Sequence, residues 1–399
     1  MTRRRIDASH VIAYQDGEHR YLRDGVVVSE GNEIIHVGPA GSWSAPVDET
    51  IDASGMVLTP GFINTHTHLY ESPLDKSFVE DMGRRQFYLS GLFEYLPVRS
   101  QAMDEEAAHA CLAFSMAELL RTGTTTVMEI GSQGEEAVRQ AGRFGMRLYM
   151  GLGYRSGRWY TDDGKEVKYA WDEEAGLRNM DRAVRFIEEH AGSQNDRIRG
   201  FLSPSQVDTC SEALLRRSRE AATAMGVPMA LHTSQSVNEF QEMTRRHGVT
   251  PIEWLRDIGF LGPDVILGHA IVVAPGTWTN WAGDDIGILA ETGTNVAHCV
   301  WVFARRGIAM ESFARYLARG VNMTLGTDTC PQSMIEGLRY TAVVSKIVDR
   351  QTEVATAADV FNAANLRLTY GGRVPFEGVV SPLHNPARGS DAWAGVGGD

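Results

Sequence analysis

From residue 57 onward, short apolar runs that suit β-strands alternate with amphipathic runs that suit helices. The runs that suit strands are Val57–Asn64, Thr124–Ile130, Arg147–Leu152, Ile198–Leu202, Pro228–Leu231, Val265–Leu267, Thr294–Ala297 and Asn322–Leu325. Helical runs such as Glu105–Arg121 and Ser211–Ala224 lie between them. A helix between two strands supplies the crossover connection that parallel pairing requires, so this alternation predicts a parallel sheet. Eight such units over about 300 residues predict a (β/α)₈ barrel of the TIM type.

The segments on either side of the barrel pattern have a different character. Residues 1–56 contain short β-rich runs broken by turn signals, which predict a small antiparallel unit. The barrel is then expected over residues 57–368. Residues 369–399 show little periodicity and are interpreted as an atypical tail, disordered or truncated. The connection over 69–123 is too long for a simple crossover, so we expect it to cover the site.

Composition excludes several classes of protein. The net charge of −13 argues against nucleic-acid binding, which needs a basic surface. The four cysteines form no C-x-x-C pair, and they are interpreted as reduced thiols of a cytoplasmic protein. No stretch approaches 18 apolar residues, so no membrane span is expected. The basic start, Met1–Asp7, is not followed by the apolar core of a signal peptide.

Two histidines end the first apolar run, with one residue between them. Side chains two apart on a strand point to the same face, so His66 and His68 can bind one metal ion together. His232, His269 and Asp328 also stand at the ends of predicted strands. In this kind of barrel the active site lies at the carboxyl ends of the strands, so all five side chains are expected to converge.

The residue types indicate the chemistry of such a site. Imidazoles and a carboxylate suit Zn²⁺, Fe²⁺ or Co²⁺, and zinc is the first expectation for a single divalent ion. The ion would lower the pKa of a bound water and supply hydroxide. Asp328 could touch both metal and water and accept the proton, while His269 could polarise the atom under attack.

With these residues in place, the chain resembles the amidohydrolase superfamily, in the branch of atrazine chlorohydrolase and related aminohydrolases and deaminases. The matching motifs are Leu58–His68, Arg121–Thr126, Leu231–Thr233, Leu267–Ala270, Asn295–Cys299 and Leu325–Asp328. The resemblance implies a mononuclear metal held by His66, His68, His232 and Asp328, with His269 and Asp328 catalytic. It also implies that residues 1–56 form most of a small β-sandwich, incomplete at the C-terminus.

Several positions depart from the pattern of that branch. Gln235 stands where its deaminases usually carry a glutamate that shuttles protons. Ser203–Gln206 offers no lysine that could be carboxylated, which favours one metal ion over two. After His298, itself a candidate substrate contact or structural residue, Trp301 and Phe303 are either pocket wall or plain packing. Arg305 and Arg306 are interpreted as a solvated helix start.

The leading hypothesis is therefore a metal-dependent hydrolase in which metal-bound hydroxide attacks a small organic substrate. The bond cleaved would be a C–N bond of an amide, carbamate or urea, or a bond to an amino or halo group on a nitrogen heterocycle. Gln235, His298, Trp301 and Phe303 are the candidate substrate contacts. The alternative is a deaminase of a purine- or pterin-like ring, and a non-catalytic scaffold is the third possibility. A homo-oligomer is compatible with each of these.

Overall fold

The computed structural model describes residues 1–15, 18–76 and 84–365. Within these residues the chain forms two compact units, one ending at Gly61 and one beginning at Phe62. The predicted tail, 369–399, lies outside the described residues.

The first unit is a four-stranded sheet with a small apolar core. Its strands are β1 Arg3–Gln15, β2 Glu18–Glu30, β3 Glu33–Pro39 and β4 Glu49–Leu58. In the order β3-β2-β1-β4, the first two pairings are antiparallel and β4 runs parallel to β1. Val11, Leu22 and Val37 are among its buried side chains.

The boundary between the units differs from the expected one. Val57 and Leu58 belong to β4, and the first barrel strand, β5, begins only at Phe62. Pro60 has no amide hydrogen to donate to a neighbouring strand, so the apolar run divides into two strands at Pro60 and Gly61. An apolar run read without its partners cannot show this division.

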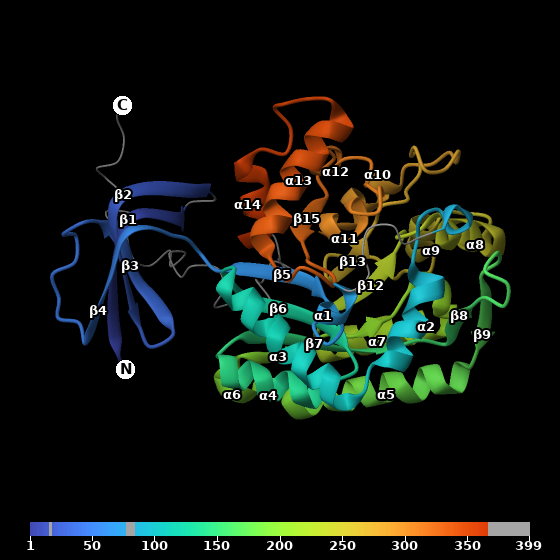
Figure 1. The fold of residues 1–399 in the computed structure, drawn as a ribbon, viewed down its shortest axis with the longest axis horizontal. Coiled ribbons are helices and arrows are strands. Elements are labelled where there is room, and N and C mark those ends of the chain that lie inside the picture. Colours follow the sequence, from blue (N-terminus) through green and yellow to red (C-terminus); the bar gives the residue numbers. More distant parts are fainter. Residues whose placement is uncertain (16–17, 77–83, 366–399) are drawn as a thin grey trace. The chain divides into compact units, whose positions relative to one another are not determined.

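The second unit is the (β/α)₈ barrel that the alternation predicts (Figure 1). Its strands are β5 Phe62–Thr67, β6 Thr124–Gly131, β7 Arg147–Tyr154, β10 Ile198–Gly200, β12 Met229–Thr233, β13 Val265–His269, β14 Asn295–His298 and β15 Asn322–Leu325. They form the parallel series β10-β7-β6-β5 and β12-β13-β14-β15, and β11 Ser203–Pro204 adds to β7. Bridges at Thr67–Asp328 and Leu202–Met229 join the two series into a barrel.

Helices surround these strands, with one short hairpin. The helices are α3 Glu105–Arg121, α4 Gly134–Phe144, α5 Glu173–His190, the irregular α6 Ser193–Asp196, α7 Glu212–Met225, α8 Val237–His247, α9 Pro251–Asp257, α10 Asp285–Thr292, α11 Val300–Ala304, α12 Phe313–Ala318, α13 Met334–Asp349 and α14 Ala357–Asn365. The hairpin is β8 Gly157–Tyr160 and β9 Lys168–Trp171, and a 3₁₀ turn, η2, spans Val207–Thr209. Helix α7 begins at the cap Ser211, whose hydroxyl accepts from the Leu214 amide, and ends at left-handed Gly226.

The long connection after β5 contains extra helices. These are α1 Ser72–Asp75, η1 Arg85–Phe87 and α2 Leu92–Ala102, which precede α3. Ser90, Leu92 and Tyr95 from this connection line the cavity at the strand ends, so it does cover the site. Among the described residues, no helix has both the length and the apolarity to cross a membrane.

Candidate metal centre and active-site cavity

Three histidines that are far apart in the sequence meet at the carboxyl ends of the strands. His66 lies in β5, His68 directly follows it, and His232 lies in β12; one ring nitrogen from each is within 4.8 Å of the others. The Nε2 atoms of His68 and His232 are 3.1 Å apart. Asp328, after β15, places Oδ1 3.5 Å from His68 Nε2. The structure thus brings together the four predicted ligands.

Hydrogen bonds on the far side of two rings fix which nitrogen can bind a metal. Nδ1 of His68 lies 2.7 Å from the Ile130 carbonyl, and Nδ1 of His232 lies 2.6 Å from the Ser205 carbonyl. A carbonyl only accepts, so each Nδ1 carries the hydrogen and each Nε2 has a lone pair. Two lone pairs facing each other repel unless a cation lies between them. Zinc–nitrogen bonds of about 2.0 Å would place tetrahedral neighbours roughly 3.3 Å apart, close to the observed separation.

Burial keeps the imidazoles of His66 and His232 neutral, which ligation requires. His66 is 1% exposed, and neither of its ring nitrogens has a hydrogen-bond partner among the described residues. Burial, reinforced by the neighbouring imidazoles, holds the pKa of His66 well below its usual value. Burial likewise lowers the pKa of His232 to about 3. A fully buried neutral ring whose one lone pair has no donor is what a missing ligand bond leaves, so the residues fit a metal ion.

Asp328 is held in place by its backbone. Its amide donates to the His66 carbonyl at 3.0 Å, and its carbonyl accepts from the His68 amide at 2.8 Å. The residue has φ of 59°, a conformation that costs a residue other than glycine about 1 kcal/mol or more. This conformation persists because two backbone hydrogen bonds to the end of β5 hold the turn. Burial is the main cause that raises the pKa of the Asp328 carboxyl, and His68 opposes the rise.

A buried polar cluster supports this turn from below. The side-chain amide of Gln332 donates to the carbonyls of Asp328 at 3.2 Å and Thr329 at 2.5 Å. Its oxygen accepts from the hydroxyls of Thr67 at 3.1 Å and Thr327 at 2.6 Å. Gln332 is fully buried, and the cluster joins the first and last strands of the barrel. Sequence patterns alone give no signal for it, because its members are about 260 positions apart along the chain.

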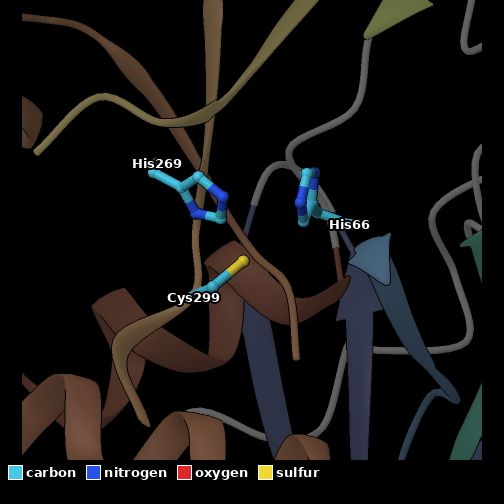
Figure 2. A group of neighbouring side chains, drawn as sticks. All are labelled: His66, His269 and Cys299. Carbon is cyan, nitrogen blue, oxygen red and sulfur yellow. The ribbon is translucent and has the colours of Figure 1, made fainter. Parts of the chain in front are cut away.

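His269, the last residue of β13, lies beside this group. Its Nε2 is 3.9 Å from Asp328 Oδ2, and its ring is 4.6 Å from that of Phe303. Its backbone is left-handed, with φ of 87°, and its Nδ1 has no partner among the described residues. Figure 2 shows the sulfur of Cys299 pointing toward the gap between the rings of His66 and His269. Burial raises the pKa of this thiol well above its usual value, so it is a neutral neighbour of the site.

A cavity of about 420 Å³ opens above the histidines. Gln235 and Phe303 line it, together with His68, His232, His269 and Asp328. Of the predicted substrate contacts, the structure does not bring His298 or Trp301 into the lining. Trp301 instead packs on Tyr340 of α13, with ring centroids 4.4 Å apart. Residues two apart on a helix point about 200° apart, so Trp301 and Phe303 cannot both face the cavity from α11.

The cavity also contains charged side chains that sequence reasoning missed. Arg99 of α2 bridges two carboxylates of the lining, Glu71 at 2.5 Å and Asp75 at 2.7 Å. Arg306, interpreted above as a solvated residue at a helix start, follows the end of α11 and lines the cavity. That interpretation is wrong because the helix is only one turn long and returns the chain toward the site. The signal that could have found Arg306 was its spacing of one turn from Phe303.

Comparison with known proteins places the chain in a family. Residues 57–367 match the model of the amidohydrolase family. The chain is 28% identical to a 5′-deoxyadenosine deaminase of Methanosarcina barkeri over 83% of this chain and 71% of that one. It is 29% identical to a 5-methylthioadenosine/S-adenosylhomocysteine deaminase of Thermococcus sibiricus, over 84% of this chain and 73% of that one.

Solved structures share the fold. An adenosine deaminase from Xanthomonas campestris with bound zinc superposes with a TM-score of 0.75 at 21% identity, covering 91% of this chain and 78% of that one. A triazine hydrolase from Arthrobacter aurescens gives a TM-score of 0.76 at 20% identity, covering 97% and 83%. Together with the family match over most of the barrel, the convergence of the histidines and the carboxylate gives one conclusion. The chain belongs to the amidohydrolase family and is a metal-dependent hydrolase of C–N bonds.

Proposed function

We propose that this chain removes an amino group hydrolytically from a small nitrogen heterocycle, with one zinc ion held by His66, His68, His232 and Asp328. The observation that carries the proposal is the pair of Nε2 lone pairs 3.1 Å apart, beside a carboxylate at the floor of a cavity of about 420 Å³. Such a volume accommodates a heterocycle with a modest substituent. The names of the deaminases similar in sequence support an aminated ring as substrate.

The donor set favours zinc among the divalent ions. Imidazole nitrogens with one carboxylate oxygen are a common catalytic zinc environment, although iron and cobalt share these ligands. When bound, the ion lowers the pKa of a coordinated water toward neutrality. Everything else in the reaction depends on how this chain's own side chains orient the substrate and move protons.

Asp328 is the group best suited to move the proton. Of the carboxylates among the described lining residues, Glu71 and Asp75 are both paired with Arg99, which leaves Asp328. Its two oxygens face different partners, Oδ1 toward His68 and Oδ2 toward His269. We propose that one carboxylate therefore accepts the proton of the attacking water and delivers it to the departing amine. His269 would donate or accept a hydrogen bond close to the carbon that is attacked, and so orient the substrate there.

Gln235 would orient the ring rather than protonate it. Its side chain is 4% exposed and lines the cavity, and its Nε2 has no hydrogen-bond partner among the described residues. A buried amide donor without an acceptor is costly, so a substrate that offers an acceptor gains affinity. A ring nitrogen is such an acceptor. An amide cannot shuttle a proton at neutral pH, so this step would fall to Asp328 alone.

The same glutamine favours a second candidate, displacement of chloride from a heterocycle. The amino group must gain a proton before it can leave as ammonia, whereas chloride leaves without a proton. A site with one proton-transferring carboxylate could therefore release chloride as readily as ammonia.

One experiment tests both candidates. Purified protein is loaded with Zn²⁺, Fe²⁺ or Co²⁺ and incubated with pairs of pyrimidines, purines and triazines that differ only in an amino or chloro substituent. Release of ammonia supports the first proposal, and release of chloride alone supports the second. Protein that contains stoichiometric metal and releases neither from any pair would contradict both. The small-molecule substrate and the cytoplasmic location expected from the cysteines belong to the same proposal.

A further inference from the structure

We infer that Arg306 makes the cavity selective for substrates that carry a carboxylate a short distance from the reacting ring. This inference rests on the proposed function, since it names the substrate class of the same site. It starts from a difference between two adjacent arginines after α11. Arg305 donates to the sulfur of Cys330 at 3.3 Å and does not line the cavity, whereas Arg306 does line it.

The turn after α11 directs Arg306 inward. The Arg306 amide donates to the Phe303 carbonyl at 2.9 Å, and the Ile308 amide donates to the same carbonyl at 3.1 Å. Its guanidinium lies against Gly91 at the start of α2, where an added Cβ would be 3.7 Å from both Cζ and one terminal nitrogen. Any larger residue at Gly91 would narrow the space beside this guanidinium. The side chain is thus enclosed between two walls of the cavity.

Within residues 1–15, 18–76 and 84–365, no carboxylate lies within ion-pair distance of this guanidinium. The carboxylates of Asp75 and Asp328 act on its pKa only as charges beyond that distance. Asp75 is bonded to Arg99, and Asp328 faces the histidines. Burial is the main cause that lowers the pKa of Arg306, with the charge of Arg305 adding to it. A partly buried cation without a partner is stabilised by an anion that enters the cavity.

The charge of the lining points the same way. The described lining has three carboxylates, Glu71, Asp75 and Asp328, and three guanidiniums, Arg99, Arg155 and Arg306. These charges cancel, and a histidine must be neutral to bind a metal ion. A bound divalent cation therefore leaves the cavity positive. Such a site attracts anionic substrates and disfavours cationic ones.

Geometry limits where the anionic group would sit. The Phe303 ring is 4.6 Å from the His269 ring, and the Arg306 guanidinium shares with His269 a cavity of only about 420 Å³. A heterocycle over His269 would thus need its carboxylate directly on the ring or on a short arm. A guanidinium binds a carboxylate through two parallel hydrogen bonds, which a neutral amide cannot reproduce.

Calorimetry on the zinc-loaded protein tests this without requiring turnover. The probes are aminopyrimidines that carry either a carboxylate or a carboxamide at the same ring position. Wild-type protein is expected to bind the carboxylate at least about tenfold more tightly than the carboxamide. Arg306→Gln should abolish this preference, and Arg305→Gln, which removes the same charge outside the lining, should keep it.

Two results would overturn the inference. One is equal or undetectable binding of both probes to wild-type protein. The other is a carboxylate preference that survives in Arg306→Gln while that variant remains folded by circular dichroism. Ammonia release is measured on the same samples, so that a missing activity counts against the proposed function and a missing preference counts against Arg306.

Discussion

Replacing Gln332 by leucine would remove a support of the metal centre without touching a ligand. The leucine side chain has similar volume but no polar atoms, so the Thr329 carbonyl loses its buried partner, while the Thr327 hydroxyl still accepts from the Asn64 side-chain amide at 2.7 Å. One unsatisfied buried group costs about 1–3 kcal/mol, which is the expected loss of unfolding free energy. The Asp328 carbonyl retains its bonds from the His68 amide and the Thr67 hydroxyl.

The measurement is denaturant unfolding of the zinc-loaded protein, followed by tryptophan fluorescence, together with kcat and KM. We expect kcat to fall by about tenfold or more with little change in KM, because Asp328 would move relative to the histidines while the cavity wall is unchanged. Gln351→Leu, at an exposed position just after α13, is the matched control. An unfolding free energy within about 0.5 kcal/mol of wild type, with unchanged kcat, would refute the argument that this cluster positions Asp328.

Three further predictions follow from the site and the barrel. His232→Ala should lower the bound metal well below one ion per chain, as measured by elemental analysis, while His247→Ala on α8 should leave it unchanged; equal metal content in both would contradict the ligand assignment. Gln235→Glu should raise ammonia release relative to chloride release, because it adds a proton-carrying group to the lining; an unchanged ratio would show that the glutamine does not limit deamination. Burial raises the pKa of Asp285 from 3.8 to about 6, so its ionisation destabilises the fold as pH rises from about 4 through 6, by about 3 kcal/mol in total. Asp285→Asn should remove the decrease in unfolding free energy between about pH 4 and 6, as measured by urea unfolding. An unaltered pH dependence in this variant would disprove the assignment of the decrease to Asp285.

The sequence predicts the ligands well because strand ends are a local property. His66, His232 and Asp328 each follow an apolar run, and parallel strands bring their carboxyl ends to one side of the barrel. The alternation of runs was also enough to predict the barrel itself. The strand boundary at Phe62 was predicted less accurately, because the pairing partner of Val57 lies in β1 and not in the barrel.

The direction of individual side chains could not be predicted as well as the strands and the metal ligands. Whether Trp301 or Phe303 faces the cavity depends on the rotation at which α11 starts, and a five-residue helix leaves no periodicity to read. Arg306 and Gln332 depend on contacts across the barrel, with Gly91 and with Thr67. Such contacts are fixed only when the strands are assembled.

The pairing of His66 with Asp328 has a consequence for how the protein is made. The first and the last barrel strands meet at these residues, so the metal ligands on either side of that junction are separated by nearly the whole length of the domain. A growing chain cannot complete the coordination sphere until residue 328 has left the ribosome. The metal ion would then bind late in folding. It would also stabilise the contact between the first and last strands, which closes the barrel. Loss of the ion should consequently speed hydrogen exchange first at the amides of His68 and Asp328, ahead of the strands on the opposite side.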